Sequence, residues 1–275
     1  MTAVPPVAPQ GTLLDLLELE EIDRDIYRAD LVYPDQHALY GGQVAAQALM
    51  AAGRTVPADR PPHSLHSYFL RPGDANRPTV FRVERDRDGR SFSARRVVAL
   101  QDGKVLFNLS CSFAVPEDGP DQQVDPVPVA EPPEGLPVAA LPRLLSMESR
   151  LPSQPGAFES PWPVRFWARA TLALPDHGLL HACALTYLSD IYTGVAALPG
   201  SGNRTATSID HAVWFHRPVR LDDWVLMDLV PHSTANGRGL YSGTVHDRAG
   251  VLAATLSQEV LYRLRRPAPT GGAAS

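Results

Sequence analysis

The stretch Gly42-Gln-Val-Ala-Ala-Gln-Ala-Leu-Met-Ala-Ala52 consists mainly of helix formers and is apolar on most of its faces. A second stretch, Leu179–Tyr192 (LLHACALTYLSDIY), has the same largely apolar character. A helix that is apolar all round belongs inside a protein rather than on its surface. These two stretches therefore predict two buried helices around which the rest of the chain is arranged.

Segments typical of β-strands follow each predicted helix, because they are rich in valine, phenylalanine and alternating apolar residues. In the first half these segments are His63–Leu70, Thr79–Asp86, Ser91–Gln101 and Lys104–Val115. In the second half they lie near Thr207–His216, Trp224–Ser233, Gly239–Arg248 and Leu252–Arg263. One helix followed by about four antiparallel strands, twice over, predicts an α+β fold with a sheet wrapped round a helix in each half.

The two halves also share landmarks at a nearly constant offset. The motif Tyr68–Pro72 (YFLRP) is matched by Trp214–Pro218 (WFHRP), which lies 146 residues further on. Two later pairs of landmarks are Gly89–Ser93 with Gly237–Tyr241, at an offset of 148, and Asp102-Gly103 with Ala249-Gly250, at an offset of 147. A constant offset of this kind predicts a duplicated unit.

A proline-rich segment separates the two halves. Twelve prolines fall from Pro116 to Pro163, and each of them lacks a backbone donor and fixes φ. Such a density excludes a long helix or a central strand, so we expect a linker of extended pieces with a short helix around Leu141–Ser149. The predicted organisation is a first unit at 1–115, a proline-rich linker at 116–163 and a second unit at 164–275.

The composition narrows the function classes. The 275 residues carry a net charge of −5, and 25 Lys and Arg are scattered among 30 Asp and Glu, which argues against a nucleic-acid partner. Cys111 and Cys183 are too few for a disulfide framework and are expected to be inert core residues. No apolar run approaches the roughly 18 residues of a membrane span, and no signal peptide is recognisable at the start. We therefore predict a cytoplasmic protein without membrane insertion.

Several common enzyme signatures are missing from the sequence. It contains no G-x-S-x-G, H-E-x-x-H or C-x-x-C motif and no phosphate-binding P-loop. The histidines His63, His66, His211 and His216 fall in predicted strands, where packing or surface positions are more common than metal ligation. The sequence therefore predicts neither a metal site nor a cofactor.

Six motifs, taken in their order along the chain, strongly resemble the type II acyl-CoA thioesterase family. They are Tyr40–Val44, His63–Asp74, Gly89–Val97, Leu179–Asp190, Thr207–Pro218 and Thr255–Glu259. The resemblance implies the double hotdog fold, in which one chain holds two units, each a long helix wrapped by an antiparallel sheet. It also implies hydrolysis of fatty acyl-CoA to free fatty acid and coenzyme A, and association into a homodimer or homotetramer.

The same resemblance places the catalytic residues in the second unit, on Asp190, Ser208 and Gln258. Ser208 stands where many members carry Thr, and Val260 stands where many carry Gly, which adds bulk expected to narrow the pocket. The chemistry is reasonable in physical terms, because a carboxylate accepts a proton from water while a hydroxyl and an amide orient that water. Desolvation at the end of an apolar helix is expected to raise the pKa of Asp190.

Two alternative functions remain open at this stage. A hotdog protein that keeps its groove but has lost its chemistry would bind acyl-CoA without cleaving it. An enoyl-CoA hydratase-like enzyme would need an Asp/His pair, yet Asp210 and His211 are adjacent and would point to opposite faces of a strand. At an offset near 147, Gln258 corresponds to Cys111, so the sequence predicts one catalytic site per chain.

Overall fold

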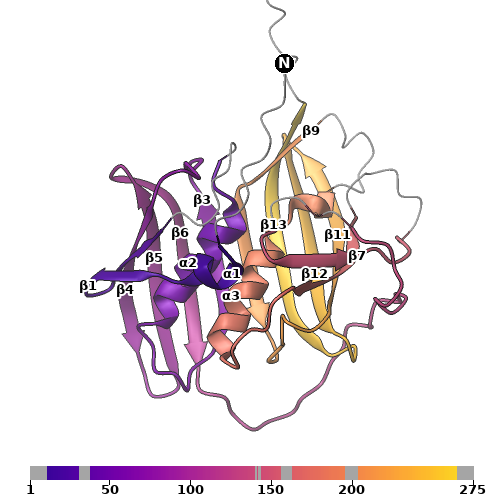
Figure 1. Cartoon of the computed structure of the whole chain (residues 1–275), viewed down its shortest axis with the longest axis horizontal. Coiled ribbons are helices and arrows are strands. Elements are labelled where there is room, and N and C mark those ends of the chain that lie inside the picture. The colour runs from indigo at the N-terminus through magenta and orange to yellow at the C-terminus, as the bar shows by residue number, and fades with distance from the viewer. Residues whose placement is uncertain are drawn as a thin grey trace, which may run out of the picture.

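The protein consists of two halves that lie side by side, and each half is a curved antiparallel sheet packed on a long helix (Figure 1). The structure, a computed structural model, describes residues 11–30, 38–139, 141, 144–155, 163–195 and 204–264. The predicted α+β architecture is confirmed. Among the described residues, no helix is long and apolar enough to span a membrane.

The first half contains the predicted helix and its four strands, together with three short elements that were not predicted. Its elements are α1 (Leu13–Leu17), β1 (Glu20–Asp23), β2 (Ile26–Ala29), α2 (Gly41–Gly53), β3 (Pro62–Phe69), β4 (Thr79–Asp88), β5 (Phe92–Gln101) and β6 (Lys104–Ala114). The four main strands begin and end within two residues of the predicted bounds.

The second half repeats this arrangement. Its elements are β7 (Met147–Arg150), β8 (Arg165–Ala170), α3 (Gly178–Ser189), the 3₁₀ helix η1 (Tyr192–Val195), β9 (Arg204–Ser208), β10 (Asp210–Phe215), β11 (Val225–Ala235), β12 (Arg238–Asp247) and β13 (Leu252–Leu264). The prediction of a short helix around Leu141–Ser149 is wrong, because Ser146 has a φ of 55° and β7 then pairs with β8. The predicted domain boundaries, with a linker at 116–163, stay a prediction.

The two halves form one continuous sheet. Its order is β1-β2-β4-β5-β6-β3-β10-β13-β12-β11-β8-β7, and β9 pairs separately with β13. The halves meet where β3 pairs antiparallel with β10, with Leu65 opposite Val213. The strands β3 and β10, which carry the start of the repeated motif in each half, therefore lie next to each other at the centre of the sheet.

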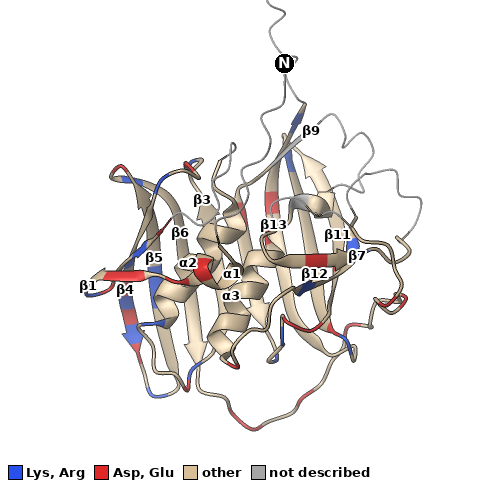
Figure 2. Ribbon diagram, viewed as in Figure 1, with Lys and Arg blue, Asp and Glu red and all other residues tan. Residues whose placement is uncertain are grey.

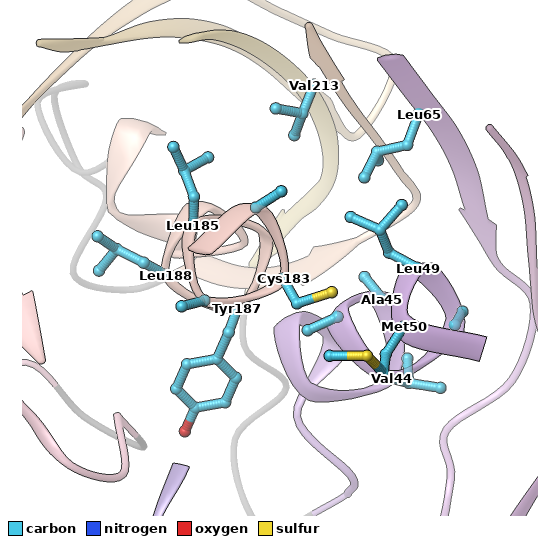
Figure 3. Close-up of a cluster of buried hydrophobic side chains, with 14 of the residues drawn as sticks. Val44, Ala45, Leu49, Met50, Leu65, Cys183, Leu185, Tyr187, Leu188 and Val213 are labelled. Atoms are coloured by element: carbon cyan, nitrogen blue, oxygen red, sulfur yellow. The ribbon is translucent and has the colours of Figure 1, made fainter. Parts of the chain in front are cut away.

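The helices α2 and α3 lie side by side inside this sheet and carry no charged residue (Figure 2). The Tyr40 hydroxyl donates to the backbone oxygen of Tyr187 at 3.0 Å, which ties the start of α2 to α3. Leu49, Cys183 and Val213 come from different elements and meet in one apolar cluster (Figure 3). The prediction of two buried helices is confirmed.

Both cysteines lie in this core without a disulfide partner. Burial raises the pKa of the Cys111 and Cys183 thiols well above the usual value, so both stay protonated near neutral pH. The thiolate is the reactive form of cysteine. These two side chains therefore act as apolar packing groups, as predicted.

Candidate active site

Asp190 lies where α3 ends and is almost completely buried, with 2% of its surface exposed. The predicted helix extended to Tyr192, but Asp190 has φ −79° and ψ 34°, and the chain turns into η1. The carboxylate is thereby held at the end of an apolar helix. This is the desolvated position that the sequence predicted for it.

Ser208 and Gln258 reach the same carboxylate from two paired strands. Ser208 ends β9, which pairs with β13 so that Ser208 lies opposite Val260, two residues beyond Gln258. The Ser208 hydroxyl donates to Asp190 Oδ1 at 3.0 Å. Gln258 Nε2 donates to Ser208 Oγ at 2.6 Å and also to Asp190 Oδ1. The structure therefore brings together all three residues predicted for the site.

The orientation of the Gln258 side chain follows from charge. An ionised carboxylate accepts hydrogen bonds only, so the amide nitrogen of Gln258 must face Asp190 and its oxygen must face away. Gln258 is fully buried, on the same face of β13 as Leu256 and Val260, as the alternation predicted. Its oxygen consequently needs a donor from the protein interior.

Tyr241 on β12 supplies that donor, although it is not among the site residues that the sequence predicts. β12 pairs with β13 so that Tyr241 lies opposite Gln258, and the Tyr241 hydroxyl donates to Gln258 Oε1. The available signal was a tyrosine on the apolar face of a predicted strand, since a buried tyrosine hydroxyl usually finds a partner. The identity of the partner depends on strand register, which the sequence did not provide.

The N-terminus of α2, from the first half, lies against Asp190. A methyl group on Gly41 would overlap Asp190 Oδ2, so only a glycine permits this approach. The first helical backbone bonds come from Gln43 N and Val44 N to Tyr40 O, and Tyr40 makes no side-chain cap. The preceding N–H groups, on Gly41 and Gly42, belong to the helix turn that lacks partners within the helix. The positive end of the helix dipole thus faces the carboxylate.

A cavity of about 580 Å³ opens beside Asp190 and Ser208. It lies between the halves and is lined by apolar side chains that include Leu39, Val44, Phe69, Leu106, Phe107 and Leu261. Val260, which was expected to narrow the pocket, packs in the core and is not among the lining residues. Val260 therefore does not itself line the cavity, and the expected narrowing stays a prediction.

Asp210 and His211 lie on opposite faces of β10, as predicted. The Asp210 carboxylate accepts from the backbone N of Glu259 at 2.8 Å, whereas the fully buried His211 ring contacts Ser189 Oγ at 2.8 Å. Burial lowers the pKa of His211 to about 4, so the ring is neutral at physiological pH. These two residues do not form an acid/base pair.

The other histidines predicted in strands are also held by neighbours. His63 contacts Ser112 Oγ at 2.7 Å, His66 packs edge-on against Trp214, and His216 contacts Thr255 Oγ1 at 3.0 Å. Within the described parts of the chain, no three His, Cys, Asp or Glu side chains are grouped in a way that would hold a metal ion.

A larger cavity, of about 910 Å³, lies at the opposite end of the two helices, near the start of α3. Gly178 and His181 line it, but Asp190, Ser208 and Gln258 do not. The smaller cavity is the candidate active site because it alone joins an apolar groove to a buried carboxylate with two oriented polar partners. The choice between the two cavities therefore rests on the side chains that line them and not on their volumes.

Among the residues of the first half that the structure describes, no equivalent of this site is found. In the strand pairing, Cys111 on β6 lies opposite Arg95 on β5, as Gln258 on β13 lies opposite Tyr241 on β12. The Cys111 thiol packs in the core and donates a weak hydrogen bond to the backbone oxygen of Arg95 at 3.7 Å. Gln258 and Cys111 therefore occupy equivalent positions in the strand pairing of the two halves, as the offset predicted.

Two family profiles cover most of the chain. The acyl-CoA thioesterase N-terminal domain matches residues 30–114, and the acyl-CoA thioesterase C-terminal domain matches residues 116–262. The chain belongs to the acyl-CoA thioesterase II family. It is therefore a thioester hydrolase that acts on acyl-CoA, and the predicted family is confirmed.

Individual relatives agree with this assignment. Acyl-coenzyme A thioesterase 8 of Homo sapiens is 33% identical over 91% of this chain and 88% of its own length. Acyl-CoA thioesterase 2 of Haemophilus influenzae is 35% identical over 92% of this chain and 97% of its own. The crystal structure of an acyl-CoA thioesterase II from Mycobacterium marinum superposes with a TM-score of 0.77, at 38% identity over 95% of this chain and 99% of that one. The double hotdog fold is confirmed.

Proposed function

We propose that this thioesterase hydrolyses fatty acyl-CoA to free fatty acid and coenzyme A by a water molecule that Asp190 activates and Ser208 and Gln258 orient. The observation that supports it is the sharing of one buried carboxylate oxygen, Asp190 Oδ1, by Ser208 Oγ and Gln258 Nε2. This sharing occurs beside an apolar cavity at the start of a helix. No other described cluster combines a base, two orienting groups and room for an acyl chain.

The reaction follows from the roles of these groups. The water oxygen adds to the thioester carbonyl carbon while one of its protons passes to Asp190, because a carboxylate is a competent general base. The negative charge that develops on the carbonyl oxygen is stabilised by the N–H groups of Gly41 and Gly42 at the α2 N-terminus. Cleavage of the C–S bond then releases coenzyme A, whose sulfur takes the proton from Asp190, and leaves the free fatty acid.

The nucleophile in this proposal is water rather than Ser208. An activated serine needs an adjacent base such as histidine. The described side-chain partners of Ser208 are Asp190 and Gln258, and the nearest strand histidine, His211, is buried and bonded to Ser189. Mass spectrometry during turnover is therefore expected to show no acyl group on Ser208. A stable acyl-Ser208 adduct would overturn this step.

The test of the proposal is Asp190→Asn, which is nearly isosteric but cannot accept a proton. We expect kcat for palmitoyl-CoA, followed by thiol release, to fall by about 10²-fold or more, the usual contribution of a general base. Asp210→Asn is the matched control, since Asp210 is a nearby strand carboxylate bonded to the Glu259 backbone, and its kcat is expected to stay near that of the wild type. Asp190→Asn activity within threefold of the wild type would remove Asp190 from this role.

A second substrate separates the remaining alternatives. Crotonyl-CoA carries both a thioester and a double bond, so thiol release and loss of enoyl absorbance are measured on the same sample. Thiol release alone supports the hydrolase. Loss of absorbance without thiol release would identify a hydratase, and no change with either substrate would identify a binding protein.

A further inference from the structure

Tyr241 is completely buried behind the candidate site, and its hydroxyl is the only group of its side chain able to make a hydrogen bond. Two acceptors lie within reach of that hydroxyl: Gln258 Oε1, in the shorter contact, and the backbone oxygen of Ile191, at 3.0 Å. Burial and the nearby charges of Asp190 and Asp210 raise the pKa of Tyr241 well above its usual value. The hydroxyl therefore keeps its proton and remains a donor throughout the working pH range.

A carboxamide can rotate by half a turn with little change in shape, which exchanges its oxygen and nitrogen. In the orientation that serves the proposed reaction, Gln258 Nε2 donates to Asp190 and to Ser208. That orientation directs Gln258 Oε1 into the core, where an acceptor without a donor costs about 1–3 kcal/mol. The Tyr241 hydroxyl removes this penalty and so favours the orientation in which the nitrogen faces Asp190.

The position of the Tyr241 ring is itself tightly constrained. A methyl group on Gly194, in η1, would lie only 2.6 Å from Cε2 of the ring, so the ring packs directly on the glycine backbone. The hydroxyl also bonds the oxygen of Ile191, which immediately follows Asp190. One tyrosine thus connects β12, the segment after α3 and the catalytic amide.

The first half of the chain provides an internal comparison. Arg95 occupies the position that corresponds to Tyr241, opposite Cys111 instead of Gln258. Its guanidinium donates to Thr55 Oγ1 at 2.7 Å and to Asp88 Oδ1 at 2.6 Å, away from any carboxamide. The half that lacks the glutamine also lacks the tyrosine, which is expected if the tyrosine acts through the glutamine.

We propose that Tyr241 is a positioning residue that fixes the orientation of the Gln258 carboxamide, and through it the geometry around Asp190. The inference rests on the role proposed above for Gln258. Tyr241 contacts neither substrate nor water in this proposal; its effect on the reaction is transmitted by one hydrogen bond.

The test is Tyr241→Phe, which removes the hydroxyl and keeps the ring. We expect kcat for palmitoyl-CoA to fall about tenfold, the loss that corresponds to one hydrogen bond, while KM changes by less than about twofold. Tyr187→Phe is the matched control, because Tyr187 is also a buried tyrosine, and its hydroxyl accepts from the backbone N of Leu145 at 2.8 Å. The control is expected to lower the melting temperature without lowering kcat.

The same substitution in a Gln258→Ala background shows whether the effect passes through Gln258. We expect Tyr241→Phe to change kcat by less than twofold in that background. An equal loss in both backgrounds, or a Tyr241→Phe enzyme with wild-type kcat, would overturn the inference. A Gln258→Ala enzyme with wild-type kcat would instead overturn the proposed function of the glutamine.

A second variant keeps the inference testable if Tyr241→Phe does not fold. Gly194→Ala leaves the tyrosine in place but pushes its ring away from η1. We expect the same pattern, with kcat lowered severalfold and KM retained. Wild-type kcat in a folded Gly194→Ala enzyme would contradict a role for the position of the Tyr241 hydroxyl.

Discussion

Replacing Gly41 with alanine adds one methyl group at the point where α2 meets the Asp190 carboxylate. That methyl would lie about 1 Å inside the 3.4 Å at which ordinary contact with Asp190 Oδ2 begins, and it would lie 2.7 Å from Cε1 of Phe69. The start of α2 is held by the hydrogen bond from the Tyr40 hydroxyl to the Tyr187 backbone oxygen, so the Asp190 carboxylate and the Phe69 ring must move instead. Gly41→Ala is therefore expected to move the base away from the helix N-terminus without altering any catalytic residue.

The expected size of the effect follows from that displacement. A shift of about 1 Å in a catalytic group can cost about 10²-fold in rate, which corresponds to about 2.7 kcal/mol. The fold is expected to tolerate the change, because alanine is a better helix former than glycine by about 0.5–1 kcal/mol and offsets part of the local strain. The loss should consequently appear in kcat more than in the melting temperature.

Gly178 provides the control, because it begins α3 as Gly41 begins α2. A methyl group on Gly178 would meet no atom within 4 Å, so Gly178→Ala is expected to leave kcat unchanged and to hold or raise the melting temperature. Both variants are compared with the wild type by thiol release from palmitoyl-CoA and by thermal melting. Gly41→Ala activity within threefold of the wild type would refute the close approach of helix and carboxylate as a requirement for catalysis.

Two further predictions test the division between catalysis and stability. Cys111→Ala is expected to lower the unfolding free energy by about 1 kcal/mol and to leave kcat per folded molecule unchanged, whereas Gln258→Ala should lower kcat by about 10²-fold. Loss of turnover in Cys111→Ala without a shift of the melt would assign catalysis to the first half. The pKa of His211 is about 4 in the folded protein and about 6.5 in the unfolded chain. Between these two pH values only the unfolded state binds the proton, so the free energy of unfolding falls as the pH falls. Lowering the pH from 6.5 to 5 is expected to change the His211 contribution by about 1.5 kcal/mol, because half of the unfolded chains already carry the proton at pH 6.5. Urea unfolding of His211→Asn should therefore show a pH dependence that is shallower by that amount, and equal slopes would contradict it.

The fold was predictable because its main signals are local. The helices α2 and α3 are apolar on all sides, and the long strands alternate or form apolar runs, so both patterns appear within short windows of sequence. Two of the strands that were missed lack such a pattern. β1 (Glu20–Asp23) is exposed at every position, and β7 (Met147–Arg150) lies among prolines, so each is a strand only because a neighbour pairs with it.

Only the site residues that belong to family motifs could be predicted from the sequence. Asp190, Ser208 and Gln258 were identified from family motifs, and the structure brings them together. The helix N-terminus at Gly41 and the Tyr241 hydroxyl were not identified, since both depend on how distant segments pack. The three residues predicted for the site all come from the second half, whereas the structure puts the start of α2, from the first half, against the carboxylate.

The duplicated landmarks show how strand pairing refines a sequence offset. The match of Gly89–Ser93 with Gly237–Tyr241 gives an offset of 148 and places Tyr241 opposite Ser93 in the comparison. The register of the strands gives 146 instead and matches Tyr241 with Arg95, because Arg85 opposite Arg95 in β4 and β5 corresponds to Pro231 opposite Tyr241 in β11 and β12. An error of two residues keeps each side chain on the correct face of the sheet, since the period of a strand is two.

The divergence between the halves supports the prediction of one catalytic site per chain. Where the second half has a tyrosine whose hydroxyl donates to a carboxamide oxygen, the first half has Arg95, whose guanidinium also donates to the backbone oxygens of Thr55, Arg87 and Ala94. Opposite Arg95 stands the Cys111 thiol, which cannot orient water as an amide does. The first half contributes instead the helix N-terminus that faces Asp190. Each half of the duplication has thus kept a different part of one site, and neither half holds the whole of it.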